Sequence, residues 1–494
     1  MANKYILALD QGTTSSRAIL FDKEFNVIGK EQSETSQLFP KPSWVEQDAT
    51  EIRETQIFVA RKLLSRLGIE SSDILTTGIT NQRETTVIWD KKTGKPVYNA
   101  IVWQDKRTSE FCQSIKQKEI SNYIKEATGL IVDPYFSATK IKWILENVPG
   151  LKQKAINNEI LFGTIDTWLI WNLSNGALHI SDYSNASRTM LYNINDKCWD
   201  KKILDYFDIP ENILPQVKNS AEKYGFISEG VLGKNKILLS GIAGDQQAAL
   251  FGQTCFEQGS VKNTYGTGCF MLMNTGEKAV KSESGLITTI AWGLNGKIVY
   301  AIEGSVFIAG AAIQWLRDKL KIIETAQETE KIAYSVKDTA GVYVVPAFAG
   351  LGAPYWNMNA RGTICGLTGG ADYRHIVRAS LEAMAFQTKD VLNAMEKDAE
   401  ISIKNLNVDG GASANNFLLQ FQADILNIDV TRPDFIESTA LGAAFLAAIG
   451  ANIYSMDELK SKRKIDKTFI PKMSDKERNF KYNGWIKAIK KSAL

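Results

Sequence analysis

Two turns rich in glycine and threonine, far apart in the chain, constrain the fold more than any other feature. Residues 10–20 read DQGTTSSRAIL and residues 263–273 read NTYGTGCFMLM, so each turn leads directly into an apolar strand. An apolar run at residues 4–9 precedes the first turn, which predicts a strand, a turn and a second strand over residues 4–21. Because such an echo indicates an internal duplication, we predict two related domains, residues 1–251 and 252–494.

Short apolar runs alternate with longer amphipathic stretches along the rest of the 494 residues. This alternation predicts mixed α/β layers, and neither a helical bundle nor a β-sandwich. A hydrophobic content of 44% excludes a disordered chain. We expect further strands at residues 74–80, 85–89, 236–240, 341–346 and 405–408, and helices at residues 49–67, 243–251, 306–319 and 375–396.

The charge balance favours small-molecule partners. The chain has 58 Lys and Arg against 55 Asp and Glu, and the net charge of +3 provides no general field for nucleic acid or membranes. The apolar run near the amino terminus is too short for a secretory signal, and no segment reaches the roughly 18 apolar residues of a membrane span. We therefore expect a cytoplasmic protein.

Cysteine and histidine exclude several classes of site. Five cysteines without a C-x-x-C pair indicate neither a disulfide framework nor a cysteine zinc site. The only two histidines, His179 and His375, are too far apart to form a helical pair of metal ligands. A general base in this chain is therefore expected to be a carboxylate.

The first turn has the composition of a phosphate-binding loop. Its backbone amides are closely spaced, Thr13, Thr14 and Ser15 add hydroxyl groups, and Arg17 lies beside them. Asp10, at the end of the preceding strand, is placed to hold a hydrated Mg²⁺. An ordinary hairpin turn is the alternative, since the chain has neither a P-loop nor a G-x-G-x-x-G sequence.

A second glycine cluster, NVDGGASANN at residues 407–416, follows a predicted strand and precedes a helical stretch. Nucleotides bind at such junctions, because glycine allows close approach and the start of a helix offers free amides. Gly411 would then lie against an adenosine, and Asn415 would donate to its polar edge. A tight strand-to-helix connection without a ligand is the alternative.

Three further segments carry side chains suited to catalysis or binding. Asp245 follows a predicted strand and opens a helix, so it is either a catalytic base or an N-cap. Arg83 and Glu84 lie between two strands, where they form either a donor and acceptor pair for hydroxyl groups or a solvated turn. Trp103 is either an apolar wall for a carbon skeleton or a core residue.

Taken together, these segments resemble the FGGY family of carbohydrate kinases. The resemblance runs in order from residue 4 to the carboxy terminus through ALDQGTTSSRA, KPSWVEQD, TNQRETTVIWD, IVWQDKRT, GIAGDQQAALFGQ, NTYGTGCF and LNVDGGASANN. Two more segments, YFSATKIKWILEN and GTICGLTGGADYRHIVRASLE, are similar to the family signatures. The resemblance implies two ribonuclease-H-like α/β domains of the actin and sugar-kinase type, with ATP and substrate in the cleft between them.

The resemblance also implies roles for individual residues, with Asp245 as the general base and Asp10 acting through Mg²⁺. The implied polyol site comprises Arg83, Glu84, Trp103, Tyr135, Asp245, Gln246 and Phe270. The implied ATP site comprises Thr13, Thr14, Ser15, Arg17, Thr267, Gly310, Gln314, Gly411 and Asn415.

The activity implied is ATP-dependent phosphorylation of glycerol to sn-glycerol 3-phosphate in glycerol catabolism, by a homodimer or homotetramer. A kinase for another polyol or sugar, or an actin-like ATPase, is the alternative.

The lysine-rich tail after Lys460 suggests either an RNA-binding patch or, preferably, a solvated amphipathic helix.

One loop departs from the family pattern. Relatives inhibited by fructose 1,6-bisphosphate carry Gly-Gly-Thr-Arg where residues 233–236 read GKNK, and this difference argues against that inhibition. Residues 220–236 also lack the histidine that other relatives phosphorylate, so we expect no phosphohistidine switch.

Overall fold

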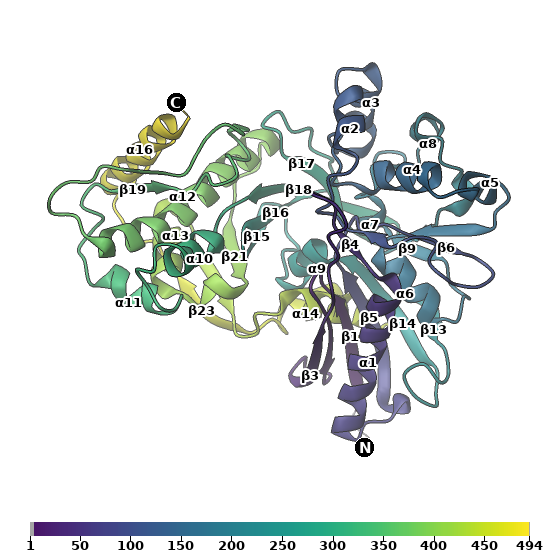
Figure 1. Ribbon diagram of the computed structural model, residues 1–494. Helices are drawn as coiled ribbons and strands as arrows, with labels where there is room; N and C mark the ends of the chain where they lie inside the picture. Colours follow the sequence, from purple (N-terminus) through teal and green to yellow (C-terminus); the bar gives the residue numbers. More distant parts are fainter. Residues whose placement is uncertain (1–3, 494) are drawn as a thin grey trace.

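The computed structural model describes residues 4–493, which form two α/β halves (Figure 1). The first half is built on a six-stranded sheet, and helices α1 (Ala49–Leu67) and α14 (Ser438–Gly450) pack against its strands. The strands are ordered β13 (Ala221–Ile227), β14 (Ile237–Gly244), β5 (Ile74–Asn81), β1 (Tyr5–Gln11), β2 (Ser15–Phe21) and β3 (Val27–Glu34).

The second half is built on a seven-stranded sheet. Its strands are ordered β17 (Ile287–Leu294), β18 (Lys297–Val306), β16 (Cys269–Gly276), β15 (Ser260–Tyr265), β21 (Asn405–Asp409), β22 (Val430–Pro433) and β23 (Ile465–Phe469). One apolar core joins this sheet to α10 (Gly310–Asp318), α11 (Glu328–Tyr334), α12 (Tyr373–Ala399), α13 (Asn416–Leu426) and α16 (Asp475–Ser492).

The two sheets repeat one local topology, which confirms the echo seen in the sequence. In the first half, β1 pairs antiparallel with β2 and parallel with β5. In the second half, β15 pairs antiparallel with β16 and parallel with β21. The last pairs before the turns are Gln11 with Ser16 and Tyr265 with Cys269, so each glycine- and threonine-rich turn closes a hairpin at the same place in its sheet.

Helix α14 comes late in the chain but packs against the first sheet. Its residues are mostly small, and two sheet glycines allow its close approach. A Cβ added at Gly78 would lie 2.0 Å from the carbonyl oxygen of Ala443, and one at Gly241 would lie 2.4 Å from the amide nitrogen of Ala447. Glycine is thus required by packing at both sheet positions, because any side chain there would separate the helix from the sheet.

The chain between β5 and β13 forms a third packed region with its own apolar core. The helices of this core are α2 (Ser109–Ile115), α3 (Glu119–Thr128), α4 (Ser137–Asn147), α5 (Leu151–Ile156) and α8 (Lys201–Phe207). Helix α6 (Ile165–Leu173) packs into the core of the first sheet, and α7 (Tyr183–Ala186) packs into a smaller separate cluster. Short strands pair as β4 (Glu46–Gln47) with β7 (Ala100–Ile101), β6 (Val87–Asp90) with β8 (Ile160–Gly163), β9 (Ile180–Asp182) with β12 (Gln216–Lys218), and β10 (Tyr192–Asn193) with β11 (Cys198–Trp199).

In the second half, β19 (Tyr343–Val345) pairs with β20 (Thr363–Cys365) and α15 (Met456–Lys460) follows α14.

Two predicted helices began too early. Helix α9 (Asp245–Gly252) and α10 start later than expected, because Ala243 extends β14 beside Thr80 and Val306 extends β18 beside Cys269. The sheet hydrogen bonds override the local helical pattern at both positions.

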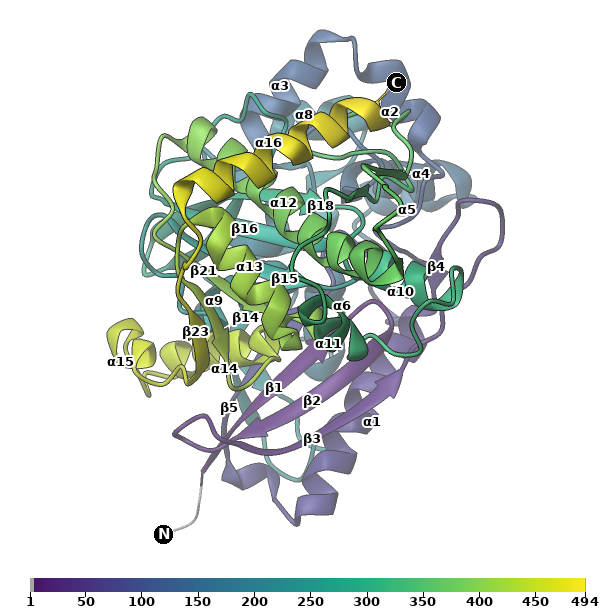
Figure 2. The same cartoon turned by 90° about the vertical axis from the view of Figure 1, so that its left-hand side faces the viewer.

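The predicted carboxy-terminal helix is present as α16, which crosses the outer surface of the second half (Figure 2). Its Trp485 is buried and stacks on Phe386, whereas Phe480 is exposed. Over residues 4–493, no helix is both long and apolar enough to cross a membrane.

Candidate active site

Arg83 is the centre of a buried charged cluster at the end of β5. Its Nη1 lies 2.6 Å from Oε2 of Glu303, and its Nε lies 3.2 Å from Oδ1 of Asp245. Its Nη2 also lies 3.5 Å from the hydroxyl of Tyr135. Because Arg83 is only 3% exposed, these contacts exclude the solvated turn that was one interpretation of the sequence.

Asp245 is the first residue of α9, and Gly244 occupies the N-cap position that the sequence left open for Asp245. The Asp245 carboxylate accepts a 2.6 Å hydrogen bond from the backbone amide of Gln246. Desolvation raises the pKa of this carboxyl, while the positive charges of Arg83 and Lys262 oppose the rise. A third of the side chain (32%) stays accessible, so the carboxylate is partly open to a ligand.

Glu84 is held in a left-handed backbone conformation, with φ at 58°. Its carboxylate accepts a 2.6 Å hydrogen bond from Nε of Arg188, and its carbonyl accepts bonds from Ser137 (3.0 Å) and Lys140 (3.4 Å). Burial raises the pKa of Glu84, and Arg188 and Arg83 oppose that rise. A non-glycine residue in this conformation costs energy, so the surrounding bonds must hold it.

The aromatic residues predicted for the polyol site have different surroundings. Trp103 packs edge-on against Tyr135 at 5.5 Å between ring centroids, and its indole nitrogen donates to the hydroxyl of Thr13 at 2.9 Å. Trp103 therefore connects the charged cluster to the first turn. Phe270 lies on β16, partly exposed and paired in register with Thr264 and Ser305.

The first turn is compact and bordered by charge. The Gly12 amide donates to the Ser15 carbonyl at 2.9 Å, which closes the turn. Beside it, Asp10 accepts a 3.3 Å bond from Arg17, and Arg17 also bonds Glu437, which comes just before α14. Burial raises the pKa of Asp10 to about 6, with Arg17 opposing the shift and the carboxylate of Glu437 adding to it.

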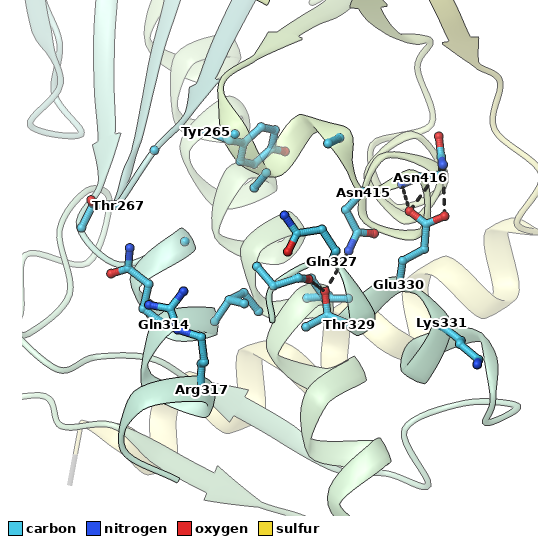
Figure 3. Close-up of a pocket in the computed structure, with 18 of the residues that line it drawn as sticks. Tyr265, Thr267, Gln314, Arg317, Gln327, Thr329, Glu330, Lys331, Asn415 and Asn416 are labelled. Carbon is cyan, nitrogen blue, oxygen red and sulfur yellow. Dashed lines mark hydrogen bonds between the residues drawn. The ribbon is translucent and has the colours of Figure 1, made fainter. Parts of the chain in front are cut away.

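A cavity of about 770 Å³ lies beside the second turn. Figure 3 shows Thr267 and Gln314 on one side of it and Asn415 on the other. All five residues predicted for the nucleotide in this half line the cavity, namely Thr267, Gly310, Gln314, Gly411 and Asn415.

Two of the predicted positions also have structural roles. Asn415 accepts a 2.9 Å bond from the Leu418 amide as the N-cap of α13, while its amide donates to Thr329 at 3.1 Å. A Cβ added at Gly310 would lie 2.5 Å from the carbonyl oxygen of Gly266, so α10 starts in direct contact with the second turn.

Sequence reasoning missed three charged residues in this region. Glu303 and Arg188 complete the cluster around Arg83 and Glu84, and Lys262 donates from β15 to Gln246 and, at 3.0 Å, to Thr264. A lone Glu inside the apolar strand sequence KIVYAIEGSV and a lone Lys in SVKNTY were signals available in the sequence. Arg188 follows a short polar helix and gave no such signal.

Two α/β halves of the same local topology each have a turn rich in glycine and threonine. A buried cluster of charges contains residues of both halves, and a separate cavity lies beside the second turn. This combination defines a two-domain kinase of the sugar-kinase type. The chain belongs to the FGGY family of carbohydrate kinases, because residues 5–252 match the model of its N-terminal domain and residues 261–451 match that of its C-terminal domain.

Curated relatives and solved structures agree with this assignment. A protein named glycerol kinase from Fusobacterium nucleatum is 59% identical over 99% of both chains, and one from Caldanaerobacter subterraneus is 59% identical over 99% of this chain and 98% of its own. A crystal structure of Plasmodium falciparum glycerol kinase with ADP has a TM-score of 0.95 at 39% identity, covering 100% of this chain and 99% of that one. A gluconate kinase from Lactobacillus acidophilus shares the fold at a TM-score of 0.87, with 21% identity over 99% of this chain and 97% of its own.

Proposed function

We propose that this protein phosphorylates glycerol at a terminal hydroxyl, with ATP as the donor and sn-glycerol 3-phosphate and ADP as products. The observation that carries the proposal is the contact between buried Arg83 and the partly accessible carboxylate of Asp245, 3.2 Å apart, in a chain whose relatives at 57–59% identity are named glycerol kinase. The contact places a cation that can donate to hydroxyl groups beside a carboxylate that is partly open to a ligand.

A polyol of three carbons offers little surface, so fixed charges must supply its orientation. In the proposed site Arg83 donates to the hydroxyl groups and Glu84 accepts from them, with Tyr135 and Gln246 completing the polar wall. Trp103 and Phe270 face the carbon chain of the polyol.

In the proposed reaction, Asp245 accepts the proton of the attacking hydroxyl. The glycerol oxygen forms a bond to the γ-phosphorus while the bond from that phosphorus to the bridging oxygen of ADP breaks. The raised pKa of Asp245 suits this role, because a stronger base takes the proton more readily as the new bond forms.

The proposed nucleotide site spans both turns. The adenosine occupies the 770 Å³ cavity against Gly411 and Asn415, with Gly310 and Gln314 beside it. The phosphates meet Thr267 from the second turn. On the opposite side they meet the first turn, through Thr13, Thr14, Ser15 and Arg17.

The residues around Asp10 fit a role for Mg²⁺ bound together with the nucleotide. Over residues 4–493, no group of three or more His, Cys, Asp and Glu side chains could hold a metal ion, so the protein offers no complete cage. Mg²⁺ in kinases instead uses one or two carboxylates, water and substrate phosphates. The carboxylates of Glu437 and Asp245 already raise the pKa of Asp10, and a divalent cation would relieve this like-charge repulsion. When bound, the ion would neutralise charge on the phosphates.

A cytoplasmic location is proposed from the sequence pattern. A role in glycerol catabolism and assembly as a homodimer or homotetramer are proposed from the family resemblance.

The proposal is tested by measuring ADP release with glycerol, dihydroxyacetone, xylulose and gluconate side by side, and with ATP alone. We expect the highest kcat/KM with glycerol and negligible ADP release without a polyol. A higher kcat/KM with xylulose or gluconate would assign the chain to another sugar, and equal ADP release without polyol would indicate an ATPase.

A further inference from the structure

Glu303, on β18 of the second half, bonds both Arg83 of the proposed glycerol site and Arg188. Its Oε2 accepts from Nη1 of Arg83 at 2.6 Å, and its Oε1 accepts from Nη2 of Arg83 at 3.3 Å and from Nη2 of Arg188 at 3.0 Å. The side chains of all three residues are at most 4% exposed. A bidentate contact of this kind fixes the plane of the Arg83 guanidinium.

Arg188 supports Glu84, the residue next to Arg83 in the chain. Its Nε donates to Glu84 at 2.6 Å, and its guanidinium packs over the rings of Tyr135 and Phe136 at 5.6 and 5.3 Å. Arg188 thus contacts two residues of the proposed glycerol site, Glu84 and Tyr135, and is linked to another, Arg83, through Glu303.

The nitrogens of the Arg83 guanidinium have different carboxylate partners. The two terminal nitrogens bond Glu303, which turns Nε toward Asp245 at 3.2 Å. Burial raises the pKa of Glu303, but Arg188 and Arg83 outweigh burial and lower it to about 2, so Glu303 stays charged at any working pH. Without Glu303, two guanidinium groups would lie next to each other with one carboxylate between them, and Arg83 would turn away from its present orientation.

We propose that Glu303 and Arg188 are positioning residues that hold Arg83 and Glu84 in the geometry that binds glycerol. This inference rests on the proposed function and deepens it, because it makes Glu303, a charged residue of the second half, a determinant of affinity for a substrate bound mainly by residues of the first half. Neither residue takes part in the phosphoryl transfer itself.

The test uses Glu303→Gln and Arg188→Lys in the full-length protein. Glu303→Gln removes a charge and Arg188→Lys shortens the side chain, so each change weakens a charged hydrogen bond, and we expect the KM for glycerol to rise roughly 10- to 100-fold. The KM for ATP should change less than about twofold, since the two residues do not line the nucleotide cavity.

Glu382→Gln provides a matched control. Glu382 is also a buried glutamate of the second half, 3% exposed in its side chain, and it faces two cations, Arg378 at 2.9 Å and Lys481 at 3.9 Å. Neither of these cations belongs to the proposed polyol site. The loss of the Glu382 charge should therefore lower the melting temperature without changing the KM for glycerol.

A double-mutant cycle with Arg188→Gln and Glu303→Gln separates positioning from general loss of stability. The combined rise in KM should be smaller than the product of the single effects, because both changes break one network. If Glu303→Gln fails to fold, Glu303→Asp keeps the charge with a shorter reach and should give an intermediate glycerol KM.

An unchanged glycerol KM in folded Glu303→Gln or Glu303→Asp would overturn the positioning proposal alone. A parallel rise in the KM of glycerol and of ATP would also overturn it, by indicating a structural role. A wild-type protein without activity on glycerol would overturn the proposed function and this inference with it.

Discussion

The two proposed binding regions use opposite means of recognition. Around Arg83, buried side chains of opposite charge lie within hydrogen-bonding distance of one another and leave few free contacts. The nucleotide cavity is open and is lined largely by glycines and neutral side chains such as Thr267, Gln314 and Asn415. A small polyol must be oriented by a few fixed charges, whereas a nucleotide supplies enough surface to be bound through shape and close backbone approach.

The contrast predicts that substitutions in the proposed polyol site change only kcat or the affinity for glycerol. The largest effect is expected from Asp245→Asn, which removes the proposed base but keeps the shape of the side chain. We expect kcat to fall roughly 10²- to 10⁴-fold while glycerol binding, measured by calorimetry, is largely preserved. Near-normal turnover would exclude Asp245 as the base.

Arg83→Ala should act on glycerol affinity. The loss of its charged hydrogen bonds is expected to raise the KM for glycerol roughly 10- to 100-fold, with little change for ATP. Thermal melting must be followed in parallel, because the change also leaves Arg188 as the remaining buried cation beside Glu303 and Glu84. An unaltered glycerol KM would show that the polyol binds elsewhere.

Gly310→Ala tests the proposed nucleotide site. The added Cβ would meet the Gly266 carbonyl oxygen at 2.5 Å, so α10 must move away from the second turn. We expect the KM for ATP to rise about tenfold, equivalent to ~1.4 kcal/mol, with the glycerol KM unchanged. Gly369→Ala is the control, since a Cβ at Gly369 meets nothing within 4 Å. Equal effects of the two changes would refute the contact as the cause.

The smallest effect concerns pH. Asp245 must be unprotonated to accept a proton, and its raised pKa places the acid limb of the kcat/KM profile above the range of an ordinary aspartate, so activity falls as the pH drops through that limb. The positive charge of Lys262 lowers this pKa, so Lys262→Met should move the limb to higher pH.

Burial lowers the pKa of Lys262 itself to about 8, so the lysine is mostly charged in the acidic pH range. Lys262→Arg keeps the charge and should leave the limb in place. A limb at the same pH in Lys262→Met and in the wild type would exclude electrostatic coupling between Lys262 and Asp245.

Local signals explain which parts of the fold were predictable. Helix α1 was predicted with its observed bounds, because Asp48 caps its start by accepting from Thr50 and Gly68 ends it in a left-handed conformation. The starts of α9 and α10 were predicted too early, because the strands continue through Ala243 and Val306 by pairing with distant strands. Pairing of this kind leaves no trace in the local pattern.

By itself, the sequence determined the duplicated hairpins with their hydroxyl-rich turns and the family to which the chain belongs, since these depend on glycine, threonine and apolar residues at short spacing. Only the tertiary structure decided which charges meet. Glu303 reaches Arg83 across 220 positions and Arg188 across 115, while Lys262 on β15 reaches Gln246 on α9. The reason is physical: a buried charge is stable only beside a partner, and sheet pairing over long distances in the chain selects that partner.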